Sequence, residues 1–110
     1  MWAFTRHGFI SIVQNRDTAD NFLVRSRDAR TLQELWPNHD IITLKDADYR
    51  FRININKDEV METLGEHILS IDYDNFKNEC VDDREYLRSL GSVWRVMYEY
   101  QLRAGDRSEG

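Results

Sequence analysis

The sequence predicts an α+β fold in which an antiparallel sheet of three to five strands, built mostly from the N-terminal half, is covered by C-terminal helices. Apolar and polar residues alternate in the first half, as they do in half-buried strands. From residue 57 onward, apolar residues recur every three or four positions, as they do on amphipathic helices. A ferredoxin-like fold or a related two-layer sandwich fits this order of elements.

The strands are predicted from runs of β-forming residues that end at turn-forming ones. They are expected at residues 2–6, 9–14, 22–26, 41–44 and 49–56. The first two form a hairpin because Gly8, which lies between them, can adopt the positive φ that a tight turn needs.

Alternation is strictest in the strand over residues 49–56, where every odd position is apolar and every even one is polar. Arg50 and Arg52 are therefore expected to project from the wet face of the sheet. The rings of Tyr49 and Phe51 are expected to point the other way, into the core.

Helices are expected at residues 29–36, 57–69, 73–80 and 83–103. Asp28 is a suitable N-cap for the first helix, and Pro37 ends it. Asn56 and Glu59 form the pattern of a capping box at the start of the second.

Two of these helices carry apolar stripes that we expect to be buried. The stripe of the helix over 57–69 consists of Val60, Met61, Leu64, Ile68 and Ile71. That of the last helix consists of Leu87, Leu90, Trp94, Met97 and Tyr98, flanked by Tyr86, Val93, Val96 and Tyr100. This second arc is wider than one sheet face demands, so we expect the last helix to pack on two neighbours.

A single domain is expected over residues 1–103, followed by a flexible tail over residues 104–110 that has no apolar anchor. Cys80 is the one cysteine among 110 residues, which excludes an internal disulfide and favours a cytoplasmic location. The apolar start of the chain contains Arg6 and His7, so neither a signal peptide nor a membrane span is expected.

The sequence contains no specific signature of catalysis, metal binding or nucleotide binding. The three histidines stand far apart, the five glycines are isolated, and no serine or cysteine lies in a nucleophile pattern. We therefore expect no metal and no cofactor, and we rank an enzyme last among the functional alternatives.

Arginines mark one candidate binding surface, since Arg50 and Arg52 share the wet face of the sheet and Arg25 joins them from another strand. Sheets that combine arginines with aromatic rings bind single-stranded nucleic acid by phosphate contact and stacking. The expected burial of the aromatic rings counts against this function. The alternative is that the arginines form ion pairs with neighbouring carboxylates.

Acidic residues mark a second candidate surface. Residues 1–56 carry a net charge of +1 and residues 57–110 a net charge of −6, so the helical half is the acidic half. The acidic face is represented by Asp58, Glu62, Glu66, Asp82 and Asp83. Such a face attracts a basic protein surface or imitates a phosphate backbone, or it simply keeps the helices soluble.

The motifs W-x-F-T-x-x-G-F-x-S-I-V-Q (residues 2–14), L-V-R-S-R (23–27), D-A-D-Y-R-F-R (46–52), I-x-Y-x-N-F-K (71–77) and W-x-x-M-Y (94–98) follow one another along the chain. Together they resemble a family of small uncharacterised proteins of bacteria and their phages, over residues 1 to about 100. The resemblance implies no activity or cofactor. Polar positions within the motifs suggest one binding surface made of Arg25, Arg27, Tyr73, Asn75 and Lys77.

Three functions remain open at this point. The first is a non-enzymatic protein-binding or regulatory module, which includes a homodimer formed through the last helix. The second is a phage-type inhibitor of a host defence complex, an anti-CRISPR-like protein whose acidic face acts as a nucleic-acid mimic. The third, ranked below protein binding, is RNA or single-stranded DNA binding through the arginine-bearing face of the sheet.

Overall fold

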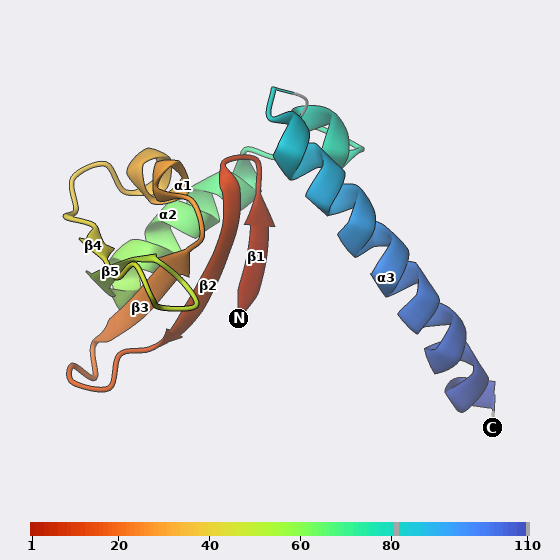
Figure 1. Cartoon of the computed structure of the whole chain (residues 1–110), viewed down its shortest axis with the longest axis horizontal. Helices are drawn as coiled ribbons and strands as arrows, with labels where there is room; N and C mark the ends of the chain where they lie inside the picture. The colour runs from red at the N-terminus through yellow and green to blue at the C-terminus, as the bar shows by residue number, and fades with distance from the viewer. Residues whose placement is uncertain (81, 110) are drawn as a thin grey trace. The chain divides into compact units, whose positions relative to one another are not determined.

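Five antiparallel strands form one sheet in the order β1-β2-β3-β5-β4 (Figure 1). The computed structural model describes residues 1–80 and 82–109. The strands are β1 (Trp2–Thr5), β2 (Gly8–Gln14), β3 (Asn21–Ser26), β4 (Ile42–Thr43) and β5 (Phe51–Asn56). The helices are α1 (Ala29–Leu35), α2 (Lys57–Leu69), the 3-10 helix η1 (Phe76–Cys80) and α3 (Arg84–Glu109). The predicted α+β fold with an antiparallel sheet is confirmed.

The chain divides into two compact units, Met1–Asp72 and Tyr73–Gly110. The first contains the sheet, α1 and α2, and the second contains η1 and α3. The single domain over residues 1–103 stays a prediction. The expected end of the last helix at residue 103 is wrong, because α3 continues to Glu109.

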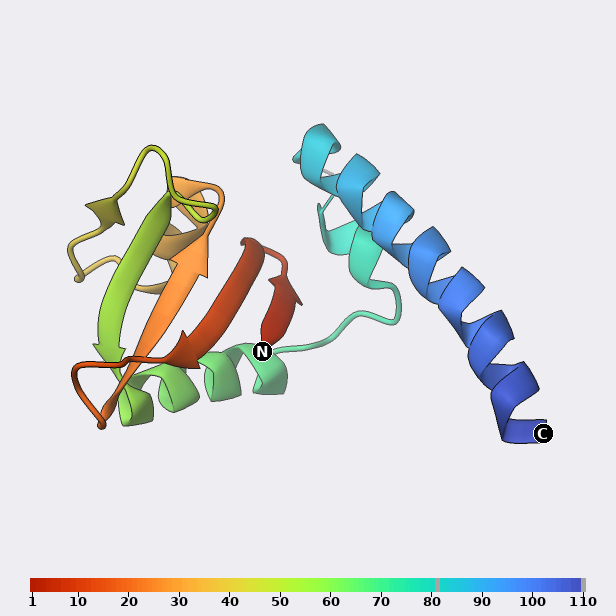
Figure 2. The ribbon, with the colours of Figure 1, turned by 60° about the horizontal axis from the view of Figure 1, so that its bottom comes forward.

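The core of the first unit lies between one face of the sheet and the two helices α1 and α2 (Figure 2). Ile12 of β2, Val24 of β3 and Ile53 of β5 lie opposite one another in the strand register, and all three are buried. Leu32 of α1 and Val60 of α2 belong to the same buried cluster. The strands β2, β3 and β5 contribute alternate residues to it, as the period of two requires.

The turn between β1 and β2 depends on Gly8, whose φ is 135°. Thr31 of α1 lies against this glycine, so closely that a Cβ atom at position 8 would overlap the Thr31 Oγ1 atom. Thr31 is itself buried. The predicted role of Gly8 in the turn is confirmed, and the glycine also allows α1 to approach the hairpin.

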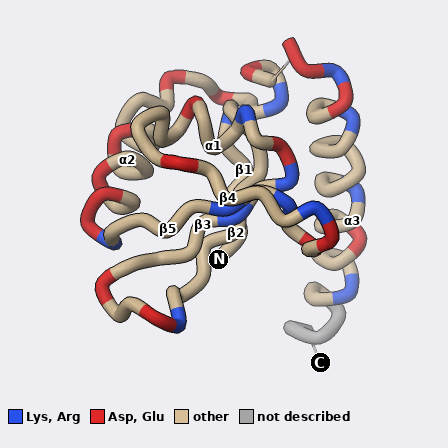
Figure 3. The backbone as a smooth tube through the Cα atoms, turned by 60° about the vertical axis from the view of Figure 1, so that its left-hand side comes forward, with Lys and Arg blue, Asp and Glu red and all other residues tan. Residues whose placement is uncertain are grey.

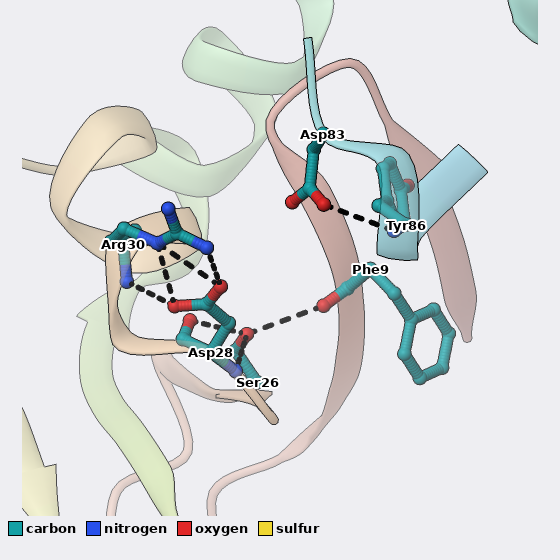
Figure 4. A network of polar contacts seen from close by, with 6 residues as sticks. All are labelled: Phe9, Ser26, Asp28, Arg30, Asp83 and Tyr86. Carbon is teal, nitrogen blue, oxygen red and sulfur yellow. Dashed lines mark hydrogen bonds and ion pairs between the residues drawn. The ribbon is translucent and has the colours of Figure 1, made fainter. Parts of the chain in front are cut away.

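The start of α1 is held by a small polar network that connects it to β3 (Figure 4). Asp28 is the N-cap, and its carboxylate accepts hydrogen bonds from the backbone and the side chain of Arg30. The side-chain hydrogen bond from Arg30 lowers the pKa of Asp28, although partial burial acts against it. Ser26 joins the network because its hydroxyl donates to the Asp28 carbonyl oxygen at 2.8 Å.

The start of α2 uses only half of the predicted capping box. The side chain of Asn56 accepts a hydrogen bond from the Asp58 backbone N–H, as expected for an N-cap. The carboxylate of Glu59, however, lies 2.7 Å from the His39 Nε2 atom. Glu59 therefore connects α2 to the loop after α1.

Both predicted apolar stripes are only partly buried. On α2, Val60 is buried, whereas Met61 and Ile68 are each 65% exposed. The sheet covers only one edge of this stripe. Ile71, beyond the helix, is also exposed. On α3, Leu90 is buried, whereas Trp94, Val96, Met97, Tyr98 and Tyr100 are exposed. Within the second unit α3 packs against η1, and the expectation that it packs on two neighbours stays a prediction.

Replacing Gly8 with alanine should destabilise the protein by about 1–3 kcal/mol, because the new methyl group meets Thr31 and the positive φ is strained for an L residue. Gly65→Ala on α2 is the matched control. No atom lies within 4 Å of its added Cβ, so it should stabilise by about 0.5–1 kcal/mol. Urea denaturation measures both. Equal effects of the two substitutions would contradict the role of Gly8.

The contribution of His67, on α2, to the stability of the protein should decrease as the pH falls below about 6.5. Burial lowers the pKa of His67, and the charges of His7 and Arg6 lower it further. The unfolded chain therefore binds a proton that the folded chain resists. The stability that neutral His67 contributes is present above the ordinary histidine pKa and is lost below it. Urea denaturation measures the free energy of unfolding of wild type and His67→Gln. The difference between the two should change between about pH 7 and 5. A difference that stays constant over this range would contradict the role of His67.

Candidate functional site

The candidate site is the open face of the sheet, opposite the core that α1 and α2 cover. The register places five residues side by side across all five strands on this face. They are Trp2, Ser11, Arg25, Arg52 and Ile42, from β1, β2, β3, β5 and β4 respectively. Each is adjacent in sequence to a residue of the opposite face, so the packing of the core determines this row.

Arg25 and Arg52 lie directly opposite each other in the β3–β5 pair. The Nη2 group of Arg25 donates to the Ser11 hydroxyl oxygen at 2.9 Å, and that of Arg52 donates to the Tyr49 carbonyl oxygen at 3.1 Å. The Nε atoms of both arginines are buried and have no hydrogen-bond partner. Within residues 1–80 and 82–109, neither guanidinium forms an ion pair with a carboxylate. Like charges opposite each other in a sheet destabilise it, so this pair favours an anion.

Tyr49 lies on the same face as these arginines, and the expectation that its ring points the other way is wrong. Its side chain packs beneath two guanidinium groups, 4.6 Å from Arg25 and 4.2 Å from Arg27 to the ring centroid. Tyr49 is only 4% exposed. The reason is that β5 begins at Phe51, so Tyr49 precedes the regular alternation. Phe51 does pack against the core, as predicted.

A cluster of aromatic rings adjoins the arginines on this face. Phe9 stacks on Phe4 with centroids 4.7 Å apart, meets Trp2 edge to face at 5.7 Å, and lies 6.3 Å from Tyr49. Trp2 is 70% exposed. A continuous band of rings therefore runs from the edge strand β1 to the arginines in the middle of the sheet.

A hollow of about 820 Å³ lies on the other side of the arginine pair along the strands. Arg25 and Arg52 form one wall, and the rest is lined by Val13, Gln14, Asn15, Arg16, Asp17, Leu23, Ile42, Leu44 and Asn54. The Asn15 side chain donates to that of Asn54 at 2.6 Å, which fixes the loop after β2 to β5. The volume is in the range of small-molecule and cofactor sites.

The remaining predicted arginines differ in their surroundings. Arg27 is paired with Asp48 at 3.1 Å, which is the ion-pair alternative that the sequence left open. Arg50 precedes β5 and is exposed. Its carbonyl oxygen accepts a hydrogen bond from the Leu44 backbone N–H.

Tyr73, Asn75 and Lys77 belong to the second unit. Asn75 accepts a hydrogen bond from the Lys77 backbone N–H at the start of η1, and the Lys77 ammonium lies 5.5 Å from the Trp94 ring. A joint surface of these residues with Arg25 and Arg27 stays a prediction.

Acidic residues line the exposed side of α2 (Figure 3). Asp58, Glu62 and Glu66 are all exposed there, as are Asp82 and Asp83 before α3. Asp83 accepts a hydrogen bond from the Tyr86 backbone N–H, so it also caps that helix. Burial raises the pKa of the nearby Tyr86 hydroxyl well above its ordinary value.

Metal sites and membrane spans are both absent from the residues that the structure describes. No group of three or more His, Cys, Asp or Glu side chains there could hold a metal ion. Nor does any helix in the same part of the chain combine the length and the apolar character that a membrane span requires.

Sequence reasoning missed the aromatic part of the site, namely Trp2, Phe4 and Phe9, and the supporting Ser11. Alternation already places Trp2 and Phe4 on one face of β1. Only the strand register shows that this is the face of the arginines.

Comparison with known proteins adds no relative. No protein-family model matches the chain, and no significant match was found among curated proteins or solved structures.

Replacing Tyr49 with leucine should destabilise the protein by about 1–2 kcal/mol, because two cation–π contacts are lost while most of the apolar volume remains. Tyr49→Phe keeps the ring and should leave stability nearly unchanged. Urea denaturation of the two variants separates the ring from the hydroxyl group. A larger loss in Tyr49→Phe than in Tyr49→Leu would contradict the role of the ring.

Proposed function

We propose that this protein binds single-stranded nucleic acid on the open face of its sheet. The observation that supports the proposal most is the pair of guanidinium groups of Arg25 and Arg52, which face each other with no carboxylate partner among the described residues. Their Nε groups are buried and keep unused donors. The guanidinium groups also line the hollow, where a phosphate group would accept from their Nη donors and offset the repulsion between the two charges.

The aromatic band distinguishes a nucleic acid from other anions. Trp2 and Phe4 are exposed next to the arginines, and bases stack on rings of this kind whatever their sequence. The carboxylate side chains of an acidic peptide would pair with the arginines but supply no ring to stack on the aromatic band. The bases of a duplex are already stacked on each other, which favours a single strand.

Because the whole chain has a net charge of −5, attraction of a nucleic acid would come only from the positive charges close to the arginine pair. The acidic residues of α2 contribute no attraction, so binding depends on a few phosphate contacts and on stacking. We expect short oligonucleotides to bind with moderate affinity and a shallow salt dependence.

Binding of another protein through the acidic face, the role of phage-type inhibitor and a cytoplasmic location also remain proposals. The exposed carboxylates of Asp58, Glu62 and Glu66 support the first two. Binding of a basic protein to the acidic face should not change when Arg25 or Arg52 is substituted. Those variants therefore distinguish binding of a protein from binding of nucleic acid.

Arg25→Gln and Arg52→Gln should each weaken binding of a fluorescent oligouridylate about tenfold or more, and each should reduce the slope of log affinity against log salt by about 0.7. Trp2→Ala should cost about 1–3 kcal/mol of binding free energy, because one stacked base is lost. Fluorescence anisotropy at several salt concentrations measures all three.

Matched controls make the experiment specific. Arg88→Gln removes the same charge from α3, and Trp2→Phe keeps a ring for stacking; both should retain most of the affinity. If wild-type protein does not bind the oligonucleotide, or if Arg88→Gln weakens binding as much as Arg25→Gln, the proposal is wrong.

A further inference from the structure

The second unit has an exposed apolar surface that the proposed function does not use. The 3-10 helix η1 packs against α3, and Cys80 of η1 and Leu90 of α3 are both buried. Beyond Leu90 most of the large apolar side chains of α3 are exposed, although Val93 is partly buried. We call them the α3 face: Trp94, Met97, Tyr98, Tyr100 and Leu102.

The α3 face is ordered by contacts within the unit. The rings of Trp94 and Tyr98 are stacked, with centroids 5.4 Å apart and planes 3° from parallel. The Lys77 ammonium lies over the Trp94 ring at 5.5 Å. Trp94 nevertheless remains 58% exposed. A flat, preorganised aromatic pair of this kind loses little side-chain entropy when a partner covers it.

The spacing of residues along α3 is typical of helix pairing. Leu87, Leu90, Trp94, Met97, Gln101 and Ala104 follow one another at intervals of three or four, as the a and d positions of a heptad do. None of these residues is charged, whereas Arg88, Arg95, Glu99 and Arg103 fall outside this series. The α3 residues of this series therefore bring no like charges together when two copies pack, and the Lys77 ammonium of η1 is the charge that lies against their Trp94 ring.

We propose that two copies of this chain pair through the α3 face. A second copy fits better than an unrelated charged partner, because the α3 side chains that form the face are uncharged and carboxylates that could complement a basic partner are absent from them. Aromatic side chains offer about 150–250 Å² each, so the half-exposed residues of this face supply about 500 Å² per copy. Two copies would bury about 1,000 Å², the lower bound for a specific interface. The pair is therefore expected to be weak and dependent on concentration.

Sedimentation equilibrium of the full chain over a range of concentrations tests this proposal. Wild type should move from monomer to dimer as concentration rises, and Met97→Glu should raise the dissociation constant about tenfold or more. Ser92→Glu is the matched control, because it adds the same charge to an exposed position of α3 outside the heptad series and should leave the constant unchanged. Far-UV circular dichroism verifies that both variants stay helical.

Two results would overturn the proposal. One is a wild-type chain that stays monomeric at every concentration. The other is an equal loss of dimer in Met97→Glu and Ser92→Glu with helicity intact. Arg25→Gln should dimerise like wild type, so failure of the nucleic-acid proposal is distinguishable from failure of this one.

Discussion

Val24 of β3 and Ile53 of β5 lie opposite each other at the centre of the core, and the helices α1 and α2 cover them. Because successive side chains of a strand point to opposite faces, this register also places Arg25 opposite Arg52. A shift of one residue would bring the arginines into the core and expose the valine and the isoleucine. The hydrophobic core therefore keeps two positive charges together on the open face.

The energetic cost of that pair is only partly offset within the described residues. Tyr49 lies under the Arg25 guanidinium, and Ser11 accepts one hydrogen bond from it. Both interactions favour the charged side chain without neutralising it. The nearest alternative, an ion pair of the kind that joins Arg27 to Asp48, is absent for Arg25 and Arg52 in the described ranges. This local excess of positive charge would attract an anion even though the chain is acidic as a whole.

Local sequence patterns predicted most of the fold, because alternation, caps and turn glycines act over a few residues. The strand at Phe51–Asn56, the cap at Asp28 and the turn at Gly8 are examples. Patterns did not predict which face of a strand meets which neighbour, so Tyr49 was placed on the wrong side. Nor does periodicity show whether a partner for an apolar stripe lies within the chain. The exposed Trp94 and Met61 illustrate this limit.

The Nε–H groups of Arg25 and Arg52 offer the most direct test of the central claim, that this pair is a site for a phosphate group. Nuclear magnetic resonance detects arginine Nε–H signals individually during titration with an oligouridylate. The signals of Arg25 and Arg52 should shift together with the Trp2 indole signal and exchange more slowly with water. If these signals stay unchanged at saturating oligonucleotide while others shift, the arginine pair is not the binding site.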